Sequence, residues 1–235
     1  MNYHSLSMMK RLLFTGYLAM ISLAAAAQTF IQPNYGLKSH ETLTINKVEA
    51  SDKSIVLLLS LENRITGGSF CVDRNTYIVY PDGTRLKMTS ASGIPLCPEA
   101  HRFSAPGDKL TFTLTFPSSG KLPEWIDLIE DCTDNCFHFY GITLDNDLNQ
   151  KINDAFGYAG GDDILKGMIS FIDILEETDQ KNLGSEGLLY VNIISLAREA
   201  GNPGQAASWY NRLRSSEAPK LQEYIKFLND QGIRY

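Results

Sequence analysis

The chain has few of the residues from which common catalytic and metal sites are built. It contains only four histidines among 235 residues, and they form no His-x-x-x-His pair and no Cys/His cluster of the kind that binds zinc. It also has no Gly-x-Ser-x-Gly motif, no phosphate-binding loop and no dinucleotide fingerprint. We therefore expect no cofactor and no metal, and no motif names a catalytic residue.

The N-terminus has the pattern of a signal peptide. Lys10 and Arg11 form a positive start, residues 12–23 are largely apolar, and four alanines end at Ala27. A spanning helix needs about 20 apolar residues followed by a polar stop, whereas this run is shorter and has no basic stop. We predict cleavage after Ala27, with Gln28 as the new N-terminus. The mature protein is then periplasmic or secreted and has no integral membrane span.

An excess of positive charge is also missing. The chain holds 21 Lys and Arg residues against 27 Asp and Glu residues. Two of the basic residues lie in the predicted leader, so 19 remain against 27, a net charge of −8. Nucleic acids and anionic membrane surfaces attract cationic proteins, so this balance argues against both as partners.

All four cysteines follow the predicted leader, and an even number in an exported chain indicates two disulfides. Of the three possible connectivities we favour Cys71–Cys97 with Cys132–Cys136. Residues 81–83, Pro-Asp-Gly, predict a hairpin turn. Residues that face each other across a hairpin have a constant sum of residue numbers, and the sum for Cys71 and Cys97 is close to the one expected for this hairpin. Acidic residues surround Cys132 and Cys136 and disfavour a thiolate, so we expect a structural link rather than a redox dithiol.

Residues 42–144 have the pattern of strands separated by turns. The clearest strand spans residues 109–116, where four apolar residues alternate with polar ones. These apolar residues are Leu110, Phe112, Leu114 and Phe116. Residues 55–61 are almost continuously apolar, which predicts a central strand buried on both sides. The number and spacing of the strands predict an all-β sandwich.

The strand order resembles that of the immunoglobulin-like sandwich in DUF4352-type bacterial secreted domains. The resemblance rests on an apolar strand ending in Glu62-Asn63, on Asp82-Gly83 in the hairpin, and on the Pro106-Gly107 step into residues 110–116. It covers residues 40–144 and implies an extracytoplasmic β-sandwich without known catalytic residues. The four cysteines depart from that family's pattern.

From about residue 145 the hydrophobic period changes from 2 to 3.6, so we predict a β domain over 28–146 and an α-helical domain over 147–235. The run Asp145-x-Asp147-x-Asn149 is similar to the start of a calcium loop. Gln150 replaces the Gly of that loop and Phe156 replaces its bidentate Glu. We therefore predict a polar linker and a helix N-cap instead.

Five helices are expected in this second domain. Asp162 or Asp163 is expected to cap the second, and Ser185 is expected to cap the third. The predicted apolar stripe of the second helix consists of Ile164, Leu165, Met168, Ile169, Ile172 and Leu175.

The third and fourth helices resemble one tetratricopeptide repeat. The residues that carry this resemblance are Tyr190, Ile193, Ala197, Gly201, Ala206, Tyr210 and Pro219. Ile194 stands where the repeat has its Gly, which puts the close helix crossing in doubt. The resemblance implies a concave protein-binding face. The alternative is a plain group of helices packed on the sandwich.

We expect an exported, non-catalytic binding or assembly protein of the cell envelope, whose partner is another envelope protein. The alternative is an exported hydrolase, directed at glycans, with an unrecognised active site. Trp209 and Tyr210 are neighbours on a helix, so both cannot point fully inward. We expect one ring near the surface as a partner contact; the other interpretation has both rings packed between the helices and the sandwich.

Overall fold

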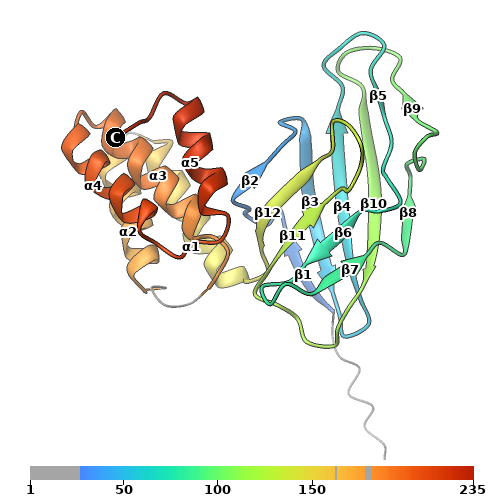
Figure 1. The fold of residues 1–235 in the computed structure, drawn as a ribbon, viewed down its shortest axis with the longest axis horizontal. Helices are drawn as coiled ribbons and strands as arrows, with labels where there is room; N and C mark the ends of the chain where they lie inside the picture. The colour runs from blue at the N-terminus through green and yellow to red at the C-terminus, as the bar shows by residue number, and fades with distance from the viewer. Residues whose placement is uncertain (1–26, 162, 178–181) are drawn as a thin grey trace, which may run out of the picture.

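The structure is a computed structural model that describes residues 27–161, 163–177 and 182–235. An antiparallel β region over residues 28–143 precedes five helices over residues 146–230, as Figure 1 shows. The predicted order of strands followed by helices is thereby confirmed. The predicted leader, residues 1–26, and the predicted cap residue Asp162 lie outside the described residues.

Two five-stranded sheets and a short two-stranded ribbon form the β region. The first sheet has the order β1-β3-β4-β10-β8, which are Gln28–Ile31, Leu43–Ala50, Ser54–Glu62, Lys109–Pro117 and Ser90–Ser92. The second has the order β2-β12-β11-β6-β7, which are Leu37–Lys38, His138–Thr143, Trp125–Ile129, Tyr77–Val79 and Arg85–Lys87. The ribbon pairs β5 (Ser69–Phe70) with β9 (His101–Arg102). Neighbouring strands in all three pair antiparallel.

The strand β10 alternates as the sequence predicts, since Phe112, Leu114 and Phe116 are buried. The strand β4 is central, between β3 and β10, which is also confirmed. Its predicted burial on both sides is wrong. Every second residue from Ile55 to Leu61 is buried, whereas the residues between them are only half-buried. One face of β4 therefore packs into the main core, which draws residues from both sheets.

The predicted hairpin is confirmed, because Tyr77 lies opposite Lys87 and the backbone N–H of Tyr80 donates to the carbonyl of Thr84. Met88 extends this pairing by donating its backbone N–H to the carbonyl of Thr76. The register of the hairpin is therefore the one from which we predicted the cysteine pairing.

Both predicted disulfides, Cys71–Cys97 and Cys132–Cys136, are present. The reason given for the first is wrong, however. Val72, next to Cys71, bridges to Leu96 in a parallel arrangement, outside the antiparallel hairpin. The disulfide thus fastens a loop-to-loop contact instead of extending the ladder.

The helices are α1 (Asn146–Ala159), α2 (Ile164–Glu177), α3 (Glu186–Glu199), α4 (Pro203–Arg214) and α5 (Leu221–Asp230). They gather at one side of the β region, beside β2 and β12 (Figure 1). Their buried residues form a second hydrophobic cluster, separate from that of the sheets. Within the described ranges, the structure has no helix of sufficient length and apolarity to cross a membrane.

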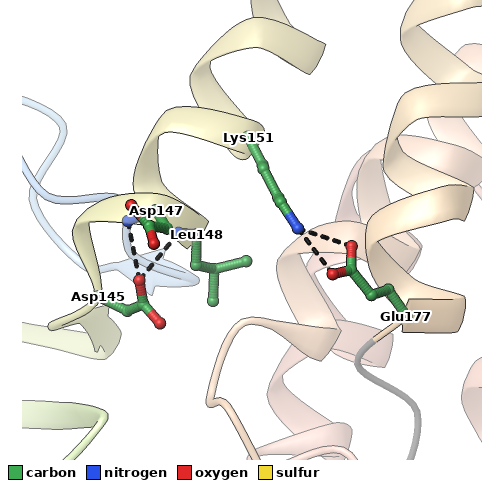
Figure 2. Close-up of polar contacts among 5 residues, drawn as sticks. All are labelled: Asp145, Asp147, Leu148, Lys151 and Glu177. Atoms are coloured by element: carbon green, nitrogen blue, oxygen red, sulfur yellow. Dashed lines mark hydrogen bonds and ion pairs between the residues drawn. The ribbon is translucent and has the colours of Figure 1, made fainter.

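The carboxylate of Asp145 caps α1, as predicted. Figure 2 shows one of its oxygens accepting hydrogen bonds from the backbone N–H groups of Asp147 and Leu148, at 2.9 and 3.0 Å. The helix begins at Asn146, directly after this cap. Lys151 then ties α1 to the end of α2 through an ion pair with Glu177 at 2.7 Å, also in Figure 2.

The predicted apolar stripe of α2 is wrong in part. Met168 and Leu175 are buried, but Leu165 is 56% exposed and Ile169 is 53% exposed. The buried face instead includes Phe171 and Ile174. The helix is apolar over most of its circumference, so the positions of α1 and α3 decide which side is covered.

The cap of α3 also differs from the prediction. Ser185 occupies the N-cap position, but its side chain makes no capping hydrogen bond. The side chain of Glu186 accepts one from the backbone N–H of Leu183 at 2.7 Å. In α4, by contrast, Asn202 caps as its sequence position suggests and accepts from the N–H of Gln205.

Candidate functional site

An ion pair between a buried carboxylate and a partly exposed lysine joins the second sheet to the last helix. Asp127 on β11 is 2% exposed, and one carboxylate oxygen accepts a hydrogen bond from the N–H of Gly141 at 2.8 Å. Its other oxygen lies 3.2 Å from the ammonium group of Lys220, just before α5. Burial raises the pKa of Asp127, while the Gly141 bond and the Lys220 charge act in the opposite direction.

Aromatic rings surround this ion pair. The ammonium of Lys220 lies 4.8 Å from the centre of the Tyr140 ring, and the His138 ring stacks on Tyr140 at 4.3 Å between centroids. Burial lowers the pKa of His138. His138 is half-buried on β12. The hydroxyl of Tyr224 on α5 is buried near this group without a hydrogen-bond partner among the described residues.

The two other strongly desolvated carboxyl groups are also bonded to the backbone. Glu130 accepts from the N–H groups of Asp73 and Phe137, at 2.8 and 3.0 Å. Glu186 accepts from Leu183, as described above. Burial raises the pKa of both groups. These acids hold loops and termini in place, and among the described residues no His, Cys, Asp or Glu group has the arrangement of a metal site.

The predicted contact residue Trp209 lies inside the helical cluster. It is only 8% exposed, with its ring 6.1 Å from that of Tyr190 and the guanidinium of Arg212 at 4.1 Å over its face. Arg212 also pairs with Glu176 at the end of α2. Trp209 therefore fastens α4 to α3 and is covered on its outer side by Arg212.

Tyr210 is buried as well, at 4% exposure. Its hydroxyl donates to the side-chain oxygen of Asn229 at 3.3 Å, and its ring lies 5.6 Å from that of Tyr235. The expectation that Trp209 or Tyr210 has an exposed ring is wrong. Both rings belong to the helical cluster rather than to that of the sheets, so the interdomain alternative is wrong too. The reason is that α4 contacts both α3 and α5, which buries a wider arc of its surface.

Tyr210 nevertheless forms part of a groove between α4 and α5. The groove has a volume of about 430 Å³ and is lined by Tyr210, Arg214, Leu221, Gln222, Ile225 and Tyr235. Arg214 is the one charged residue of this lining. Its side chain is exposed and forms no hydrogen bond or ion pair with any residue that the structure describes.

The C-terminal segment that forms this groove is basic in an otherwise acidic chain. Residues 203–235 hold five basic residues against three acidic ones, a local charge of +2, whereas the whole chain carries −6. The basic residues are Arg212, Arg214, Lys220, Lys226 and Arg234, and the acidic ones are Glu217, Glu223 and Asp230. The sequence prediction included Tyr210 but missed Arg214. The local reversal of charge is the sequence signal by which Arg214 could have been found.

Comparison with known proteins finds no match for this chain, either among protein-family models, among curated proteins or among solved structures.

Proposed function

We propose that this protein is an exported, non-catalytic binding or assembly protein of the cell envelope, and that the α4–α5 groove holds an acidic segment of another envelope protein. The observation that carries the proposal is the exposed guanidinium of Arg214, which pairs with no described residue, in a groove that two tyrosines also line. Arginine pairs with carboxylates through two parallel hydrogen bonds, which gives both strength and orientation.

The floor of the groove supports a protein partner more than a small ion. Tyr210, Leu221 and Ile225 line the groove together with the polar side chains of Arg214 and Gln222, and the exposed ring of Tyr235 stands beside them, so the lining offers both polar and aromatic contacts. Aromatic and arginine side chains at the centre of an interface commonly contribute most of its binding free energy. Tyr210 thus keeps its proposed binding role as a wall of the groove, whereas Trp209 does not line it.

Export is supported by two features of the chain. The N-terminal pattern is that of a signal peptide, and both disulfides belong to the kind of cross-link that persists in oxidising compartments. We also propose that the two sheets form a sandwich of the immunoglobulin-like type, supported by a core that draws side chains from both. The tetratricopeptide resemblance of α3 and α4 stays a proposal of the same kind.

The alternative function, an exported hydrolase, has no observation in its favour. A glycan hydrolase requires carboxyl groups that face a cleft from both sides of the scissile bond. Here the buried carboxyls of Asp127, Glu130 and Glu186 are bonded to backbone N–H groups, and none of them lines the α4–α5 groove.

A photo-crosslinking experiment in the native envelope tests the proposed contact. A photoreactive residue replaces Gln222, an exposed wall residue, and the cross-linked adducts are compared with and without Arg214→Glu. We expect a discrete adduct that Arg214→Glu removes. Arg198→Glu, a matched charge reversal at an exposed position on α3, should leave it intact. No adduct, or one indifferent to Arg214→Glu, contradicts the proposal.

A further inference from the structure

A second groove lies where the N-terminal segment meets the helices. It has a volume of about 300 Å³ and forms between the β1–β2 connection, the strand β3, and the helices α1 and α3. Its apolar lining consists of Pro33, Tyr35, Ile45, Phe156 and Leu188. Pockets for small molecules are commonly lined in this way and occur preferentially between domains.

The walls of this groove are held in place before any ligand arrives. The backbone N–H of Asn34 donates to the side-chain oxygen of Asn149 at 2.7 Å, and its side-chain amide donates to Asn149 and Asn153. The ring of Tyr35 meets that of Phe139 edge to face at 5.1 Å. A ligand therefore loses little free energy in ordering these walls.

The ring of Phe156 forms the helical wall. It packs edge to face on Phe171 at 5.0 Å but leaves 38% of its surface exposed. A large aromatic ring that is anchored on one edge and uncovered on the other offers apolar area that a ligand can bury.

The groove carries no ionised side chain. Apart from the apolar residues and Gly36, it is lined by Gln32, Asn34 and Thr44. The nearby ammonium of Lys38 lies 5.6 Å from the centre of the Tyr35 ring, and it already donates to the carbonyls of Glu41 and Leu43. Burying a charged ligand without a partner is costly, so this lining selects against ionised ligands.

Two polar side chains remain available to orient a ligand. Gln32 and Thr44 both line the groove, and neither side chain makes a hydrogen bond to another described residue. An amide and a hydroxyl on the rim of an apolar groove can bind a hydroxyl, amine or carbonyl group. We propose that this groove binds an uncharged, largely apolar small molecule that carries one such polar group.

A matched pair of fluorescent probes tests this ligand class on the full mature chain. N-phenyl-1-naphthylamine is uncharged, and 8-anilinonaphthalene-1-sulfonate is the same ring system with a sulfonate added. We expect saturable, one-to-one binding of the neutral probe and at least tenfold weaker binding of the sulfonate. Equal affinity for the two probes, or no saturable binding of the neutral one, overturns the proposal.

Substitutions then locate the site. Thr44→Trp fills the groove from β3 and should weaken binding of the neutral probe at least tenfold, as should Phe156→Ala. Phe156→Ala also removes a contact with Phe171. If that loss prevents the variant from folding, Thr44→Trp becomes the deciding test of the binding site, provided that its circular dichroism is unchanged. Leu165→Ala removes an exposed apolar side chain that does not line the groove and should leave binding unchanged. Binding that survives Thr44→Trp, or that Leu165→Ala abolishes, places the probe elsewhere and refutes the assignment.

Discussion

The ammonium of Lys220 lies 3.2 Å from a carboxylate oxygen of Asp127, so a charge from the helical region neutralises one that is buried in the second sheet. The contact is asymmetric. Asp127 is almost completely buried, whereas the side chain of Lys220 keeps 36% of its surface exposed. Removing the lysine therefore leaves an unpaired buried carboxylate, which is the costly half of a broken pair.

We predict that Lys220→Met destabilises the protein by about 1–3 kcal/mol, which is less than the loss of a fully buried pair because water reaches Lys220. Methionine keeps the apolar stem over Tyr140 and removes only the charge. Urea unfolding measures the cost. Lys226→Met, at an exposed position of α5 without an ion pair to any described residue, is the control and should change little. The pair contributes nothing if both variants unfold at the same urea concentration.

Glu186 should make the stability of the protein depend on pH. Its pKa is raised by burial, and the hydrogen bonds to backbone N–H groups only partly offset this. A carboxyl group whose folded pKa lies above its unfolded pKa stabilises the fold when protonated, and this contribution is lost as the pH rises through the folded value. Glu186→Gln keeps the oxygen that accepts from Leu183 but cannot ionise.

We therefore expect Glu186→Gln to be more stable than the wild type at pH 8 and to lose this advantage as the pH falls toward 4. Thermal melts of both proteins across that range measure the difference. Glu199→Gln, at an exposed position near the end of α3, should show no such trend. A constant difference between Glu186→Gln and the wild type at every pH contradicts the prediction.

The strands could be predicted where apolar and polar residues alternate along the chain and only one face of the strand is buried. The strand β10 is such a case, and so is the hairpin of β6 and β7, whose turn residues set its register. The two-residue strand β2 was missed because it is too short for a period to be visible. The buried face of α2 was predicted wrongly because too many of its residues are apolar. Leu165 and Ile169 are as apolar as Phe171 and Ile174, so the pattern alone did not choose between the two sides.

The candidate sites were harder to predict from the sequence than the strands were. Asp127 and Lys220 meet only because α5 returns to the second sheet, and no local spacing records that contact. The adjacency of Trp209 and Tyr210 does constrain their directions, but it predicts exposure only for a helix that is covered on one side. The helix α4 contacts two other helices, so both rings find partners.

The predicted division near residue 146 leads to a test with a truncated chain. The two hydrophobic clusters are separate, which favours independent folding of a fragment over residues 28–149. The fragment keeps Asn149, whose side chain bonds Asn34 and the carbonyl of Thr143. It loses the cover over Trp125, whose indole N–H donates to the carbonyl of Asn182 in the full chain.

We expect this fragment to show strand-type circular dichroism and a cooperative melt, at a lower temperature than the full chain. The matched comparison is the full mature chain carrying Trp125→Phe, which loses the hydrogen bond to Asn182 but keeps the helices. A fragment that remains unfolded means that the helices are required to complete the β region.

The ring of Tyr224 is held between two glycines from the two parts of the chain. A Cβ atom on Gly187 in α3 would overlap the ring, and one on Gly36 in the β1–β2 connection would overlap the hydroxyl. Tyr224 is 1% exposed, so the ring has no free volume into which to move. We therefore predict that Gly187→Ala destabilises the protein by about 1–3 kcal/mol through overpacking, even though alanine favours helices.

Gly157→Ala is the matched control, because Gly157 lies in α1 with nothing within 4 Å of the added carbon. It should stabilise the protein by about 0.5–1 kcal/mol through helix propensity alone. Chemical denaturation of both variants separates the two effects. If Gly187→Ala and Gly157→Ala stabilise the protein equally, the ring of Tyr224 moves aside for the added carbon and the overpacking prediction is wrong.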